Sequence, residues 1–108
     1  MQTLVGLALS VTYLQATANE FSEQHQQVVA LFKSNEEMAT KDAVWTSAKI
    51  FKIGVIDNGT IRDGYADYAC QVLYDYGFAG KKVWVQIIDI VKLTESGKWE
   101  KLGEKHCL

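Results

Sequence analysis

The chain has 108 residues, of which 48% are hydrophobic and 22% are charged, and its formal net charge is −2. This length corresponds to a single domain, since domains commonly hold about 150 residues. With 2 Cys, 8 Gly and no Pro, the chain is neither collagen-like nor a disulfide-dense scaffold. The slightly acidic balance also argues against nucleic-acid binding, which needs a basic face to neutralise phosphates.

The N-terminal 19 residues contain no charged side chain. Residues 4–14 are apolar, and Ala16-Thr17-Ala18 fits an A-x-A cleavage site, so residues 1–18 are predicted to be a signal peptide. The stretch is too short for a stable membrane span, which takes about 20 apolar residues. Large and small side chains also alternate over residues 5–13, which is typical of a strand and leaves a structural N-terminal strand as the alternative.

The first half of the remaining chain predicts one helix and one strand. Residues 19–33 form the helix, with Asn19 as its N-cap, and the polar residues 34–43 connect it to the strand. The strand covers residues 44–57 and ends at the turn residues 57–59. Its alternation places four apolar side chains on one face: Trp45, Phe51, Ile53 and Val55.

The second half predicts a helix and a hairpin. Residues 63–76 form the helix, capped by Asp63 and ended by Gly77. Residues 83–91 are apolar on both faces, as in a central strand, and residues 94–98 turn the chain into an edge strand at 99–107. The inner stripe of this helix is Ala66, Ala69, Cys70, Leu73 and Tyr76.

These elements predict a small α+β single domain over residues 19–108. Their order is α-β-α-β-β, which gives a three-stranded mixed sheet packed by two helices. The strands at 44–57 and 83–91 should run parallel, because a helix connects them. Their C-terminal ends should then lie at the same edge of the sheet.

That shared edge is the candidate ligand-binding site. Ligands of open α/β sheets favour the carboxyl ends of the strands, and carboxylates beside a guanidinium could bind a polar ligand or perform acid–base hydrolysis. The alternative is that the same residues are ordinary turn and cap residues. The predicted set is Asp57, Asn58, Thr60, Arg62, Asp89 and Trp99.

A second candidate is an aromatic interaction surface. Trp45 and Trp84 are expected at the opposite edge of the sheet, and Tyr68 and Tyr74 on the outer face of the second helix. Tyrosine and tryptophan are enriched in protein interfaces. Half-buried packing of these rings on their own elements is the competing interpretation.

The two cysteines predict one disulfide, Cys70–Cys107, if the chain is exported. Because Cys70 lies in mid-helix, this bond is expected to need a bend at Gly103 that folds the tail back over the helix. His25 and His106 have no spacing to the cysteines that fits a zinc site, so neither a metal ion nor a cofactor is predicted.

The sequence therefore predicts a periplasmic or secreted binding module that has no assigned catalytic residue and recognises a protein partner. Two alternatives stay open. One is a small-ligand or hydrolytic site at Asp57, Arg62 and Asp89. The other is a cytoplasmic homodimer that uses residues 3–14 as an extra strand.

Overall fold

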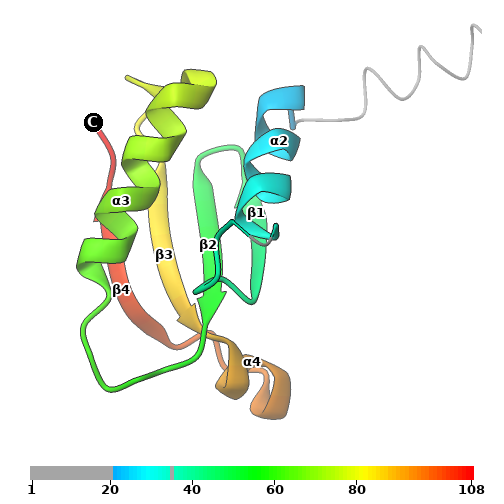
Figure 1. Ribbon diagram of the computed structural model, residues 1–108, viewed down its shortest axis with the longest axis vertical. Helices are drawn as coiled ribbons and strands as arrows, with labels where there is room; N and C mark the ends of the chain where they lie inside the picture. Colours follow the sequence, from blue (N-terminus) through cyan, green and yellow to red (C-terminus); the bar gives the residue numbers. More distant parts are fainter. Residues whose placement is uncertain (1–20, 35) are drawn as a thin grey trace, which may run out of the picture.

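A computed structural model describes residues 21–34 and 36–108 of the chain (Figure 1). The predicted signal peptide, its strand alternative and the N-cap Asn19 lie outside the described residues. The described part is a small α+β single domain, which confirms the predicted class. Within it, no helix is both long and apolar enough to cross a membrane.

The sheet has four strands in the order β1-β2-β3-β4, where three were predicted. Strands β2 and β3 are parallel, as expected, and the other two pairs are antiparallel. The predicted edge position of the last strand is also confirmed. The elements in chain order are α2 (Glu23–Phe32), β1 (Asp42–Ser47), β2 (Ile50–Val55), α3 (Asp63–Leu73), η1 (Tyr74–Phe78), β3 (Trp84–Asp89), α4 (Ile90–Ser96) and β4 (Lys101–His106).

The prediction of one strand over residues 44–57 is wrong. The chain reverses after β1 and returns antiparallel as β2, with Trp45 opposite Phe51. Residues that face each other in an antiparallel pair project to the same side, so the predicted apolar face survives the reversal. The reversal at Ala48-Lys49 contains neither Gly nor Asn, the residues that usually mark a hairpin turn.

The prediction of a turn at residues 94–98 is also wrong, because α4 occupies this region. The carboxylate of Asp89 accepts hydrogen bonds from the backbone N–H groups of Val91 and Lys92, at 3.1 and 3.2 Å, and so caps the helix. Gly97, at φ 75°, ends it. Residues 87–91 are apolar except for Asp89, and similar β-branched residues lie on both sides of the boundary between β3 and α4, so composition does not mark where the strand ends.

Helices α2 and α3 lie on the same face of the sheet (Figure 1). Helix α3 follows an N-cap at Arg62, where Asp63 was expected, and buries four of the five residues of its predicted stripe completely: Ala66, Ala69, Cys70 and Leu73. Helix α2 follows the N-cap Ser22 and buries Val28 and Phe32. These helices and the strand residues beneath them form the core.

Among the described residues, only one end of the opposite face of the sheet is covered by a helix. There α4 packs Ile90 against Gly54, where a β carbon would lie 2.8 Å from the Ile90 side chain. We call the rest of this side the open face. Its strand residues are Val44, Ile50, Lys52, Trp84, Lys101, Glu104 and His106. Gln86 and Ile88 on the same side are buried, and the ring of Trp99 lies beside Lys52.

Candidate functional sites

The predicted ligand site lies where β2 and β3 end together. Val55 pairs with Asp89 in the parallel register, and Asp57 follows two residues later. Lys92 follows Asp89 by three residues, in the first turn of α4. Its pKa is raised, chiefly because its ammonium donates a 3.0 Å hydrogen bond to Glu100, with smaller effects from the charges of Asp89 and Asp57. The two carboxylates therefore share one edge of the sheet.

Most polar groups at this edge are engaged in local structure. Asp57 accepts a 2.8 Å hydrogen bond from the backbone of Gly59, and Asn58 accepts two from Thr60. Asp89 is only 4% exposed and caps α4. These contacts close a turn and start a helix, which are the structural roles that such residues commonly have.

Arg62 fixes the loop between β2 and α3. Its Nη2 donates to the carbonyl of Ile56 at 2.8 Å, and its backbone N–H donates to Leu102 in β4 at 2.9 Å. Its Nε is buried and has no hydrogen-bond partner among the described residues. The guanidinium thus fastens the loop to its own start at Ile56, and the backbone N–H of Arg62 holds the loop against β4.

Trp99, the last member of the predicted ligand set, belongs to a different surface. It precedes β4 and is 48% exposed, and the ammonium of Lys52 lies 4.5 Å from its ring centre. Lys52 belongs to the open face, so the structure divides the predicted set between a turn, a helix cap and the open face. The described residues contain no cluster of three side chains that could hold a metal ion.

The predicted aromatic surface is divided as well. Trp45 is only 7% exposed, its ring stacks on Phe78 at 5.2 Å, and its indole N–H donates to the carbonyl of His25. Trp45 is thus a core residue because β1 turns it beneath α2. Trp84 is half-buried and lies on the open face.

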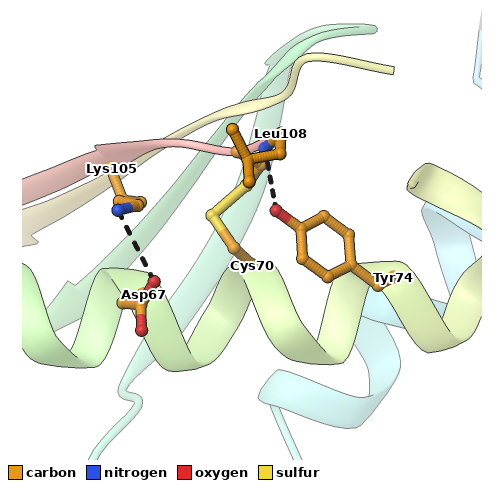
Figure 2. The surroundings of a disulfide bond; sticks show 6 residues. Asp67, Cys70, Tyr74, Lys105 and Leu108 are labelled. Carbon is orange, nitrogen blue, oxygen red and sulfur yellow. Dashed lines mark hydrogen bonds and ion pairs between the residues drawn. A yellow bond between two sulfur atoms is a disulfide. The ribbon is translucent and has the colours of Figure 1, made fainter. Parts of the chain in front are cut away.

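Tyr68 and Tyr74 do lie on α3, but their hydroxyl groups bind other parts of the chain. Tyr68 donates a 2.5 Å hydrogen bond to Glu37, and the pKa of Tyr68 is raised to about 12, chiefly by this bond and further by burial and the charge of Glu37. The hydroxyl of Tyr74 accepts a 2.8 Å hydrogen bond from the backbone of Leu108 (Figure 2). Tyr68 therefore holds the loop before β1 by a hydrogen bond, and Tyr74 holds the C-terminal residue in the same way.

Trp84 is the centre of a polar and aromatic cluster on the open face. His106 stacks on its ring at 4.9 Å, and the ammonium of Lys101 lies 5.1 Å from the ring centre. The indole N–H donates to Glu104 at 2.9 Å. The pKa of Glu104 lies below its ordinary value, first because Lys101 donates a hydrogen bond to it and then because Trp84 does.

Lys52 was not among the site residues predicted from the sequence. Among the described residues, no carboxylate lies within ion-pair distance of its ammonium. The ammonium instead makes a cation–π contact with the ring of Trp99. The alternation of β2 carried the signal, since Lys52 lies between Phe51 and Ile53 and must face away from the core.

The predicted disulfide, Cys70–Cys107, is confirmed, with the α carbons 5.5 Å apart (Figure 2). The predicted fold-back at Gly103 is wrong, because β4 runs on through this residue to His106. Gly103 contacts the start of α3, and helix and strand then run side by side. Seven helical residues rise about 10 Å, and four strand residues rise about 13 Å, so the two cysteines meet without a bend.

This disulfide fits an oxidising compartment, where such bonds persist. No protein-family model matches the chain, and no curated protein or solved structure is significantly similar to it. The geometry of its surfaces is therefore the basis for a functional proposal.

Proposed function

We propose that this protein is a small exported binding module that recognises a partner protein through the open face of its sheet. The observation that carries the proposal is the pair Lys52 and Trp99, a charged and an aromatic side chain on a sheet face that α2 and α3 leave uncovered. Catalysis is not part of the proposal.

The apolar side chains of this region support a protein partner. Trp99 is 48% exposed and Val44 is 44% exposed, and both line a small hollow with Lys52 and Leu93. Clustered exposed apolar side chains on a soluble domain commonly mark an interaction site, and tryptophan is enriched among residues that dominate binding energy.

The charge of Lys52 specifies the chemistry of the partner. Lys101 already has Glu104, and Lys92 already has Glu100, whereas Lys52 has no carboxylate within ion-pair distance in the described part of the chain. An Asp or Glu of the partner, flanked by apolar residues that cover Trp99 and Val44, would complement this surface.

Export to the periplasm or the cell exterior is the second part of the proposal. It is supported by the A-x-A pattern at residues 16–18 and by the Cys70–Cys107 bond. Mass spectrometry of the protein from its native host should find a chain that begins at Asn19 and lacks two hydrogens at the cysteines. An intact, reduced chain would contradict export and favour the cytoplasmic alternative.

The hydrolytic alternative has no comparable support. Asp57, Arg62 and Asp89 each hydrogen-bond to backbone groups close to them in sequence, which holds their polar groups in a turn, a loop and a cap.

Photo-crosslinking in the native host tests the partner surface. A photoreactive amino acid at position 44 should give one adduct with another protein, and the same amino acid at Gln71, on the exposed side of α3, should give none. Lys52→Glu should abolish the adduct. Lys105→Glu reverses an exposed charge on the helix-covered side and should preserve it.

Three outcomes would overturn this proposal. They are equal adducts from positions 44 and 71, an adduct that persists in Lys52→Glu, and an adduct of twice the chain mass. The last outcome would instead identify a second copy of this chain as the occupant of the open face.

A further inference from the structure

A cavity of about 430 Å³ opens at the opposite end of the domain from Asp57 and Asp89. It lies where the start of α2, the turn between β1 and β2, and η1 come together, and no function described above involves it. Its volume falls within the range of small-molecule sites, which is about 300–1,000 Å³.

The inner wall of this cavity includes the rings of His25 and Phe78. His25 packs edge-to-face against Phe78 at 4.9 Å and against Trp45 at 4.4 Å, and both His25 and Phe78 are buried. This edge-to-face aromatic packing gives the cavity a rigid and largely apolar wall.

Both ring nitrogens of His25 are engaged within the protein. Nε2 lies 3.0 Å from the carbonyl oxygen of Ala48, which can only accept, so Nε2 carries the hydrogen. Nδ1 then accepts a hydrogen bond from the backbone of Ser22 at 3.0 Å and lies 2.8 Å from the Ser22 hydroxyl. Both ring nitrogens are therefore held by hydrogen bonds within the protein, and His25 serves as a fixed part of the cavity wall.

The charge of the lining is positive. Lys49 and Lys81 belong to it, and among the described residues no Asp or Glu lines the cavity. Neither lysine has a carboxylate within ion-pair distance in the described part of the chain. A ligand with one negative charge would therefore meet two uncompensated ammonium groups at the mouth of an apolar cavity.

We infer that this cavity is a binding site for a small organic anion with an aromatic body. The ring of such a ligand packs against Phe78 and His25, and its carboxylate lies between Lys49 and Lys81. The site is separate from the open face, so the failure of either proposal leaves the other intact.

Nuclear magnetic resonance titration of the oxidised protein tests this inference with two isosteric probes, phenylacetate and phenylacetamide, and with the cation phenethylamine. Phenylacetate should shift the amide signals of Ser22, Ala48 and Gly77, which line the cavity. It should also bind roughly tenfold more tightly than phenylacetamide, because two exposed charge pairs each contribute modestly. Phenethylamine should bind most weakly of the three.

Two variants test whether the lysines cause the preference for the anion. Lys49→Gln and Lys81→Gln should each weaken phenylacetate binding about two- to fivefold and leave phenylacetamide binding unchanged. Lys98→Gln is the matched control, because Lys98 is exposed and lies beyond α4 at the other end of the domain.

The inference is overturned if millimolar phenylacetate leaves the amide signals of the cavity unshifted. It is also overturned if the anion and the neutral amide bind equally, or if both lysine variants bind phenylacetate as tightly as the unmodified chain.

Discussion

Gly103 of β4 lies directly against the backbone of Arg62 at the start of α3. A β carbon at position 103 would lie 2.3 Å from the carbonyl carbon of Arg62 and 2.6 Å from the nitrogen of Asp63. The backbone N–H of Glu104 donates to the Asp63 carboxylate at 2.9 Å in the same place. This close approach sets the position from which α3 and β4 run together to the disulfide.

Gly103→Ala should therefore destabilise the domain by more than about 2 kcal/mol, because the added methyl group meets backbone that cannot move without shifting the helix. Urea unfolding at neutral pH measures the loss. Gly64→Ala is the matched control, since a β carbon there meets nothing within 4 Å. It should stabilise α3 by about 0.5–1 kcal/mol. Equal effects of the two substitutions would contradict the close packing of Gly103.

The disulfide gives a second prediction. Its cysteines are 37 residues apart, and closing a loop of this length contributes about 4 kcal/mol in the chain-entropy model. The double variant Cys70→Ala with Cys107→Ala should lose roughly this amount of unfolding free energy. A reductant should destabilise the unmodified chain by a similar amount and leave the double variant unaffected. A reductant effect on the double variant would mean that the lost stability has another origin.

The sequence predicted the α+β class, the parallel pair and the buried stripe of α3, because these depend on side-chain periodicity. Periodicity also explains why the turn between β1 and β2 was not predicted. The β1–β2 turn leaves the alternation of Trp45 and Phe51 unbroken across the reversal, so the pattern fitted one strand as well as two. Only a turn marker such as Gly or Asn would have distinguished the alternatives.

The candidate sites were predicted less completely, because their residues depend on contacts distant in sequence. Trp45 was expected on a surface, but α2, which precedes it, covers it. Lys52 and Trp99 are 47 positions apart, and no local pattern joins a strand lysine to a loop tryptophan across β3. Asp89 was expected at a ligand site, and its role as the N-cap of α4 follows only when the helix is known.

Substitution of Asp89 distinguishes its role as the N-cap of α4 from a role in ligand binding or catalysis. Asp89→Ala should cost about 1–2 kcal/mol of unfolding free energy, because the N–H groups of Val91 and Lys92 lose their acceptor. Asp89→Asn keeps an acceptor oxygen and should lie within about 0.5 kcal/mol of the unmodified chain. Thermal and urea unfolding measure both. If Asn were as damaging as Ala, the carboxylate charge and not the cap would be the stabilising feature.

Tyr68 gives a prediction for alkaline pH. Its hydroxyl donates to Glu37, and the pKa of Tyr68 is raised from 10.0 to about 12, so the folded protein favours the neutral phenol. The contribution of this hydrogen bond is therefore fully present below pH 10 and is lost as the pH rises towards 12. Because Tyr68 is 43% exposed, solvent screening should keep that contribution below about 1 kcal/mol.

Urea unfolding of the unmodified chain and of Tyr68→Phe, at several values between pH 8.5 and pH 12, should show a stability difference that disappears with rising pH. Tyr74→Phe is the control, since the Tyr74 hydroxyl accepts from a backbone N–H and has no carboxylate partner among the described residues. A difference between the unmodified chain and Tyr68→Phe that stays constant or grows with pH would show that Glu37 does not hold the phenol in its neutral form.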